Sequence, residues 1–207
     1  MTSNGSLWNE RYSAEEFAYG KEPNLFFKSV IDRMTTGKLL VPAAGEGRDA
    51  VYAASLGWRV DAFDPSEQGK AKCERLSKEA SVAVNYMVTE AYGFNPDPAG
   101  YDAIVLSYFH LPTAERKAIH LLLSDWLKPG GRIILEAFSK EQFGKTSGGP
   151  KDRDWLFSKN ELAVDFSSLQ IQSCEEVETV LSEGIYHRGK ASVVRLTAIK
   201  PLASEQQ

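Results

Sequence analysis

The sequence predicts an α/β fold in which a largely parallel sheet is covered by helices on both faces and ends in an antiparallel hairpin. Three observations carry this prediction. Short apolar segments alternate with helical stretches between residues 38 and 138, as in successive βαβ units. Two of these segments, DAIVLSYF and RIILEAF, are apolar almost throughout, as in strands buried on both faces. The last two segments are joined by too few residues for a crossover helix, so they should run antiparallel.

The chain has 207 residues, of which 43% are hydrophobic, and this length favours one domain. No internal repeat and no linker interrupts it. We divide the domain into three parts: an N-terminal lid or helical segment (residues 1–36), a sheet core (residues 37–200) and a tail (residues 201–207).

The elements follow in order along the chain. SAEE at residues 13–16 has the spacing of a capping box and predicts a short helix. A longer helix should begin at Pro23, with an apolar face formed by Leu25, Phe26, Val30 and Met34. Strands are expected at residues 38–41, 59–63, 82–88, 101–107 and 132–138, and helices at 48–55, 66–80 and 113–127. SKNELAVDF predicts a last capped helix, and LQIQSCEEVETVLS and ASVVRLTAIK predict the hairpin strands.

Composition excludes several classes of protein. The net charge of -4 provides no basic surface for nucleic acid, and no run approaches the roughly 18 apolar residues of a membrane helix. Cys73 and Cys174 form no CxxC or Cys/His ligand spacing, so no metal site is expected. The N-terminus lacks an apolar signal segment, and we expect a reduced, cytoplasmic protein.

The strand-to-helix turn in KLLVPAAGEGRDAVYAASLG, residues 38–57, is the strongest functional signal. Gly45 and Gly47 allow a tight turn and a close approach of a ligand to the backbone, and the next helix begins with free N–H groups. Asp64 ends the second strand 19 residues after Gly45, where a carboxylate can bind a ribose diol. The turn therefore predicts a nucleotide-type cofactor. The structural alternative is a simple tight turn, with Asp64 only capping the next helix.

Several motifs together resemble a known family. GEGRDAVYAA, FDPS, YDAIVLSYFHLP, LKPGG and the terminal hairpin resemble the S-adenosylmethionine-dependent methyltransferases, which have a Rossmann-like, doubly wound, seven-stranded sheet. WNERYS with FAYGKEPN, HLP, SGGP and YHRGKASVV resemble the tellurite-resistance branch, related to the thiopurine methyltransferases. The resemblance covers residues 8–200. It implies S-adenosylmethionine as cofactor, a small-molecule acceptor, and a monomer or homodimer.

The resemblance also assigns site residues. It implies that Gly45 and Gly47 line the methionine half of the cofactor, that Asp64 holds the ribose and that Arg48 meets the carboxylate. Further cofactor contacts are implied for Trp8, Tyr12, Tyr19, Ala43, Pro65, Glu90, Ala91 and Ser107. Whether Thr89 or Glu90 meets adenine stays open. Val41 and Ala43 replace the family's usual acidic residue and first glycine, and Glu46 or a lid residue would have to substitute.

Four residues are candidates for catalysis or acceptor binding. The resemblance places Tyr108 beneath the sulfonium and His110 near the transferred methyl, although His110 also suits the start of a helix. His187 and Arg188 would bind an anionic acceptor, with a solvated hairpin turn as the alternative. His120 is expected to be a surface or packing residue, Trp126 and Leu127 are expected in the core, and Trp58 is expected to pack at a strand entrance.

Methyl transfer from a sulfonium is an in-line displacement that needs no covalent nucleophile, and positioning alone can lower the barrier by about 7–11 kcal/mol. A soft or anionic acceptor, such as a thiol, fits a chain with few acid/base pairs. Two other classes share the glycine turn. A NAD-dependent oxidoreductase would share Asp64 but would not ordinarily end in an antiparallel hairpin, and a non-catalytic S-adenosylmethionine-binding module would lack an acceptor pocket.

Overall fold

The computed structural model describes residues 4–96 and 98–202. The helices are α1 (Asn4–Arg11), α2 (Leu25–Ile31), α3 (Arg48–Ser55), α4 (Glu67–Glu79), α5 (Thr113–Trp126) and α6 (Lys159–Asp165), with short 3₁₀ turns η1 (Ala91–Gly93), η2 (Lys140–Gln142) and η3 (Arg153–Trp155). The strands are β1 (Lys38–Pro42), β2 (Arg59–Asp64), β3 (Asn85–Val88), β4 (Tyr101–Ser107), β5 (Leu127–Phe138), β6 (Gln170–Glu183) and β7 (His187–Ile199).

These strands form one seven-stranded sheet in the order β3-β2-β1-β4-β5-β7-β6. The pairs among β1 to β5 are parallel, whereas β7 is antiparallel to both β5 and β6. The prediction of a mostly parallel sheet with an antiparallel C-terminal hairpin is confirmed. The last residues of the predicted tail, 203–207, lie outside the described residues.

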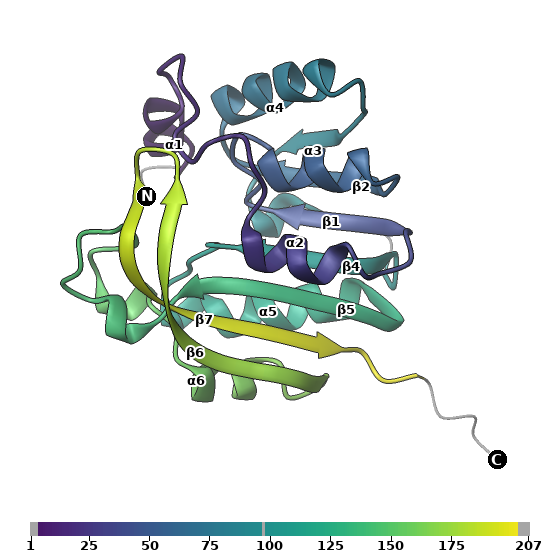
Figure 1. Cartoon of the computed structure of the whole chain (residues 1–207). Coiled ribbons are helices and arrows are strands. Elements are labelled where there is room, and N and C mark those ends of the chain that lie inside the picture. The colour runs from purple at the N-terminus through teal and green to yellow at the C-terminus, as the bar shows by residue number, and fades with distance from the viewer. Residues whose placement is uncertain (1–3, 97, 203–207) are drawn as a thin grey trace.

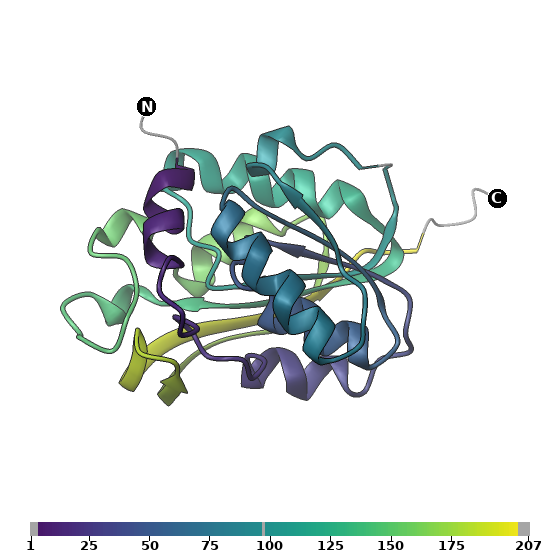
Figure 2. The ribbon, with the colours of Figure 1, turned by 90° about the horizontal axis from the view of Figure 1, so that it is seen from above.

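The central strands of the sheet are buried on both faces. One face packs against α5 and α6, in a cluster that includes Ile104, Ile133 and Leu123, and the other packs against α2 and α3, in a cluster that includes Phe27, Val105 and Ile134. Figure 2, seen from above, shows the helices in layers on both sides of the strands. The apolar runs of β4 and β5 are therefore central, as predicted.

The carboxyl ends of the parallel strands meet at one edge of the molecule. Figure 1 shows that α1, the loop between β5 and α6, and the tip of the β6–β7 hairpin all gather there. Ligands of open α/β sheets bind outside these strand ends. The fold thus brings segments far apart in the sequence to the edge where the glycine turn lies.

Three predictions for the N-terminal segment are wrong in whole or in part. Residues 13–16 form no helix, because Ser13 donates its hydroxyl to the Glu10 carbonyl at 2.8 Å and closes α1, which was not expected. The longer helix, α2, begins at Leu25 and is capped by Asn24. Its fully buried residues are Phe27 and Ile31. Of the predicted apolar face, Phe26, Val30 and Met34 pack partly buried against the same cluster, whereas Leu25 is 70% exposed.

Three strand starts also differ from prediction. β7 begins at His187 rather than Ala191, so only residues 184–186 join the two hairpin strands. β3 begins at Asn85 rather than residue 82, and β5 begins at Leu127, where the LKPGG segment is already extended and Leu127 pairs with Tyr101. The capping box of α6 is confirmed, since Ser158 and Glu161 bond each other's backbone N–H groups.

Candidate functional site

The turn between β1 and α3 has a left-handed backbone at alternate positions. Ala43, Gly45 and Gly47 have φ of 48°, 53° and 86°. A Cβ on Gly45 would stand 2.8 Å from the hydroxyl of Tyr12, and the Gly45 carbonyl accepts a hydrogen bond of 2.8 Å from Tyr86. Ala43 thus adopts, without being glycine, a left-handed backbone conformation that favours glycine.

Gly47 has a structural requirement of its own. A Cβ there would stand 2.2 Å from Sγ and 2.6 Å from Cβ of Cys73, which lies on α4. The glycine therefore allows α4 to pack against the start of α3. This packing reason holds independently of the predicted contact with the cofactor.

Asp64 lies at the end of β2 with 3% of its surface exposed. One carboxylate oxygen accepts the N–H of Gly45 at 3.1 Å, and the other accepts the N–H of Ser66 at 2.9 Å. Burial raises the pKa of Asp64 to about 6, and the two backbone hydrogen bonds oppose that shift. Ser66, not Asp64, provides the side-chain cap of α4, because its hydroxyl accepts the N–H of Gly69 at 3.0 Å.

The predicted lid residues cover this turn. Tyr12 is 4% exposed, stacks on Trp8 at 5.6 Å and contacts Tyr19 edge-on at 6.5 Å. Asn9 holds α1 to the start of α4, since its side-chain oxygen accepts hydrogen bonds from Ser66 and Gln68. Because Tyr12 lies over Gly45, we infer that a ligand enters this edge only when the segment carrying Tyr12 moves.

Glu46 is already paired. Lys72 donates to one carboxylate oxygen at 2.7 Å, and the N–H of Tyr19 donates to the other at 3.4 Å. Lys72 also donates to the Glu16 carbonyl at 2.6 Å. Glu46 thus connects the glycine turn to α4 and to the N-terminal segment.

A second group of polar side chains lies at the start of α3 and the hairpin tip. Arg48 donates to Glu183 at 3.2 Å and to the Tyr19 carbonyl at 3.1 Å. Asp49 accepts the N–H of Asn24 at 2.7 Å. Burial raises the pKa of Asp49, against the opposing effects of the Arg48 charge and a hydrogen bond with Ser107, the predicted residue at the end of β4.

Tyr108 follows β4 directly and adopts a left-handed backbone with φ of 54°. Its hydroxyl donates to Glu136 at 2.9 Å, and burial raises its pKa well above the usual value. Glu136 is 3% exposed and also accepts hydrogen bonds from Asn24 at 2.6 Å and Arg195 at 2.5 Å. The arrangement holds the Tyr108 ring at the strand end as a neutral phenol.

His187 is buried, with 5% of its surface exposed, so the alternative of a solvated turn is wrong for this residue. Its Nδ1 is 3.0 Å from the Glu183 carboxylate. The rings of Tyr108, Tyr19 and Phe138 surround it with centroids at 4.4, 4.6 and 5.1 Å. Burial lowers the pKa of His187, and the Glu183 carboxylate opposes that shift.

Arg188, next in sequence, is exposed and donates its Nε to the Gly184 carbonyl at 2.7 Å. Gly184 lies against the N-terminal segment, where a Cβ would stand 2.3 Å from the Ala18 carbonyl oxygen. The hairpin tip therefore clamps residues 17–20, which fixes Tyr19 beside His187.

His110 has both ring nitrogens engaged by backbone groups. Nδ1 is 2.8 Å from the Trp155 carbonyl, and Nε2 accepts the N–H of Phe138 at 3.2 Å. Burial lowers the pKa of His110 to about 4. The ring is thus neutral, with its proton on Nδ1, and ties the end of β5 to the loop that contains Trp155.

The remaining predicted residues lie near the glycine turn. Pro65 contacts α1, where a Cβ on Gly5 would meet its carbonyl oxygen at 2.9 Å. Ala91 is buried and begins η1, whereas Glu90 is exposed. The N–H of Thr89 donates to the Asp64 carbonyl at 3.1 Å. This contact does not distinguish Thr89 from Glu90 as the residue that would meet adenine.

The sequence prediction missed Asn24, Asp49, Glu136 and Glu183. Only Glu136 carried a readable signal, because a carboxylate inside the apolar strand RIILEAF needs a partner. Of the two roles predicted for His120, surface or packing, the structure shows packing, because the residue is fully buried and bonded to Asp165 at 2.9 Å. Trp58, Trp126 and Leu127 are buried, as expected.

Comparison with known proteins identifies a methyltransferase domain in this chain. Residues 40–131 match a family described as a methyltransferase domain. The chain is 25% identical over 205 residues to thiopurine S-methyltransferases of Legionella pneumophila strains Corby and Paris, covering 88% of this chain and 87% of theirs.

Solved structures share the fold. One, from work on the conversion of a disulfide bond into a thioacetal group during echinomycin biosynthesis, has a TM-score of 0.79 at 14% identity and covers 97% of this chain and 91% of its own. TehB from Haemophilus influenzae has a TM-score of 0.71 at 16% identity, over 95% of this chain and 66% of its own. A geranyl diphosphate C-methyltransferase from Streptomyces coelicolor, with S-adenosyl-L-homocysteine bound, has a TM-score of 0.67 at 14% identity and covers 95% of this chain and 96% of its own.

The chain is an S-adenosylmethionine-dependent methyltransferase with a Rossmann-like sheet. It is similar in sequence to thiopurine S-methyltransferases and shares the fold of TehB. Among residues 4–96 and 98–202, no helix is long and apolar enough to cross a membrane, and no three His, Cys, Asp or Glu side chains are grouped to hold a metal ion.

The residues at the strand ends suit this cofactor. Each Asp64 oxygen accepts one backbone N–H and retains a lone pair for a ribose hydroxyl. The buried carboxylates of Asp49 and Glu136 and the rings of Tyr12 and Tyr108 offer a favourable environment for a positive sulfonium. Asp64 would therefore hold the ribose, and the glycine turn would lie along the methionine half.

Proposed function

We propose that this methyltransferase acts on a small, soft or anionic acceptor, such as a thiol or a chalcogen oxyanion, by direct in-line transfer. The observation that carries the proposal is the buried His187–Glu183 pair, enclosed by aromatic rings at the ends of β4 and β5. S-adenosylmethionine supplies an electrophilic methyl group when it is bound. The chain itself has to bind the acceptor, orient it and accept its proton where it carries one.

The aromatic rings support a small acceptor. Tyr19, Tyr108 and Phe138 crowd around His187, and this close enclosure favours a small acceptor over an extended polymer. Exclusion of water by these rings strengthens the electrostatic interactions among the charged groups beside them. The pKa of Tyr108 is raised, so its hydroxyl keeps its proton and donates a hydrogen bond to Glu136. Tyr108 would therefore orient the acceptor rather than transfer a proton.

His187 is suited to take a proton. Glu183 fixes the Nδ1–H, which directs the lone pair to Nε2, and no described residue forms a hydrogen bond to Nε2. Because burial lowers its pKa, the imidazole is neutral at pH 7 and available as a general base. A thiol that arrives protonated would lose its proton to Nε2 as sulfur attacks, and an acceptor already ionised would not need this step.

We assign His110 a positioning role. Both of its ring nitrogens are occupied by backbone groups, so a proton transfer would first have to break a hydrogen bond to Trp155 or Phe138. Arg188, exposed beside His187, would attract anionic acceptors to the entrance.

The test is formation of S-adenosylhomocysteine by the purified protein with thiols of graded pKa, with selenite and tellurite, and with protein and nucleic acid. Turnover with small thiols or oxyanions is expected. Methylation of a macromolecule alone would refute the proposed acceptor class. Binding of S-adenosylmethionine without turnover of any acceptor would favour a non-catalytic binding module.

A further inference from the structure

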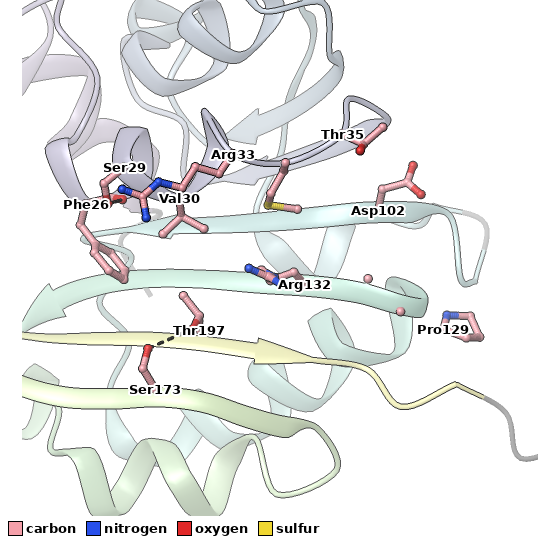
Figure 3. A pocket seen from close by; sticks show the side chains of 13 residues that line it. Phe26, Ser29, Val30, Arg33, Thr35, Asp102, Pro129, Arg132, Ser173 and Thr197 are labelled. Atoms are coloured by element: carbon pink, nitrogen blue, oxygen red, sulfur yellow. Dashed lines mark hydrogen bonds between the residues drawn. The ribbon is translucent and has the colours of Figure 1, made fainter.

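A hollow lies on the face of the sheet beside α2, away from the strand ends that carry the proposed methyl-transfer residues. The surface there is hollowed over about 620 Å³ between α2, β5, β7 and β6. Figure 3 shows its lining, with Phe26 and Val30 on α2, Arg132 on β5 and Thr197 on β7. Arg132 pairs with Ala103, near the amino end of β4, so the hollow is remote from Tyr108 and His187.

Two arginines in this hollow have no acidic partner. Arg132 is half-buried on β5 and Arg33 is exposed just after α2, and no described residue pairs with either guanidinium. Among the other buried or half-buried arginines of the described ranges, three are paired with carboxylates: Arg48 with Glu183, Arg116 with Asp165, and Arg195 with Glu136. The fourth, Arg11, donates to the Tyr19 hydroxyl at 3.0 Å. An arginine held partly out of water without a counter-ion is unusual in a folded protein.

The one carboxylate of the hollow is already neutralised. Asp102 accepts hydrogen bonds from Lys128 at 2.8 and 2.9 Å and from the N–H of Lys38 at 2.7 Å. Burial opposes ionisation of Asp102, but its hydrogen bonds to Lys128 and Lys38 prevail and hold its pKa below the usual value. The net charge that the hollow presents to a ligand is therefore positive.

The rest of the lining is mixed. Phe26, Val30 and Met34 form an apolar wall on the α2 side. On the floor, the hydroxyls of Ser173 and Thr197 lie 3.0 Å apart and can each also bond to a ligand oxygen. Apolar walls with a few convergent polar groups, in a volume of roughly 300–1,000 Å³, are typical of small-molecule sites.

We propose that this hollow binds a small anion that carries a carboxylate or phosphate head and an apolar body. The head lies between Arg132 and Arg33, whose planar guanidinium groups match both kinds of oxyanion, and the Ser173 and Thr197 hydroxyls complete its contacts. The apolar body lies against Phe26, Val30 and Met34. The site is separate from the acceptor site and does not depend on which acceptor is methylated.

Phenyl phosphate is the probe that combines such a head with an apolar ring, and inorganic phosphate is its head alone. Calorimetry at low ionic strength should show saturable binding of phenyl phosphate, tighter than that of inorganic phosphate. Arg132→Gln should weaken binding at least about tenfold and Arg33→Gln less, since Arg33 is more exposed. Arg132→Lys, which keeps the charge and loses the planar fork, should lie between wild type and Arg132→Gln.

Two controls distinguish this site from others. Arg153→Gln removes an exposed arginine far along the chain, on η3, and should leave binding unchanged. Saturation with S-adenosylhomocysteine should also leave it unchanged, because the cofactor occupies the strand ends. These substitutions leave no carboxylate without its partner, so the variants should fold, which thermal unfolding checks.

Absence of saturable binding would overturn the proposal, as would binding that Arg132→Gln leaves unaltered. Competition by S-adenosylhomocysteine would place the anion in the methyl-transfer site instead. Binding of poly-glutamate but not of phenyl phosphate would identify the hollow as a docking surface for an acidic polypeptide and contradict a small-molecule site.

Discussion

His187 lies 3.0 Å from the Glu183 carboxylate across the tip of the β6–β7 hairpin. The same carboxylate accepts a hydrogen bond from Arg48, at the start of α3. The turn between them clamps the N-terminal segment through Gly184 and Ala18. The His187–Glu183 pair thus connects the proposed acceptor site to α3 and to the N-terminal lid segment. Acceptor binding and closure of the lid should therefore be coupled.

The proposed base role of His187 predicts a dependence on the acceptor. His187→Asn keeps a donor for Glu183 but removes the Nε2 lone pair. Turnover should fall by about 10²–10⁴-fold with thiols whose pKa lies well above the assay pH and much less with thiols that are already ionised. The measurement is kcat/KM for a series of thiols of graded pKa. An equal loss across the series would indicate that His187 only shapes the site.

Arg188 provides a matched comparison, because it neighbours His187 but is exposed. Arg188→Ala should raise the KM of an anionic acceptor more than it lowers kcat, since a solvent-exposed charge attracts the acceptor without contributing at the transition state. The effect should shrink as salt is added. A fall in kcat at constant KM would show that Arg188 contacts the reacting group.

Much of the fold could be predicted from the sequence because the patterns that specify its strands and helices are local. The apolar runs of β4 and β5 and the Ser158–Glu161 box predicted the central strands and α6. The errors lie where tertiary contacts override local pattern. Ser13 closes α1 instead of opening a helix, since Glu10 lies within reach of its hydroxyl.

The site was less predictable for the same reason. Asp64 and the glycines could be identified from a turn and a spacing, but Glu183 could not, because it lies 135 residues from Arg48 and only the hairpin brings them together. The burial of His187 likewise depends on Tyr19 and Tyr108 reaching it from other elements. A residue beside a hairpin turn carries no sequence signal for such enclosure.

Cofactor affinity should depend on pH through Asp64. Its pKa is raised to about 6 by burial, so the carboxylate that accepts the ribose hydroxyls becomes protonated below that pH. Binding of S-adenosylhomocysteine should be constant above about pH 7 and weaken by up to tenfold per pH unit below about 6. Calorimetry between pH 5.5 and 8 measures this.

Asp64→Asn should bind about 1.5–3 kcal/mol more weakly at pH 7 and lose this pH dependence. Asp125→Asn, an exposed change on α5, is the control. An Asp64→Asn protein with wild-type affinity would mean that Asp64 serves the turn and α4 rather than the cofactor.

Gly47→Ala should destabilise the protein even without cofactor. The residue has φ of 86°, and the new Cβ would meet the Cys73 side chain at 2.2 Å. Strain and overpacking together should cost about 2–4 kcal/mol. Gly144→Ala is a matched control, because Gly144 has φ of 85° and nothing within 4 Å of the added Cβ. Equal losses of unfolding free energy in the two variants would mean that contact with α4 is not the reason for Gly47.

His110 should make the protein sensitive to acid. Burial lowers its pKa from 6.5 to about 4, so the unfolded chain binds the proton more readily than the folded one. The stability that its neutral form contributes is therefore complete above about pH 6.5 and is lost as the pH falls toward 4, by about 2 kcal/mol between pH 7 and pH 5. Burial lowers the pKa of His120 and His187 as well, so these residues also contribute to the loss of stability as the pH falls.

His110→Gln isolates this contribution, since glutamine can still bond the Trp155 carbonyl or the Phe138 N–H but does not titrate. Urea unfolding at pH 7 and pH 5 should show a loss of unfolding free energy smaller by about 2 kcal/mol in the variant than in the wild type. His120 and His187 are present in both proteins and cancel in the comparison. If the loss of unfolding free energy between pH 7 and pH 5 were the same in the variant as in the wild type, the His110 ring would not be held neutral between Trp155 and Phe138. The assignment of His110 as a positioning residue would then fail.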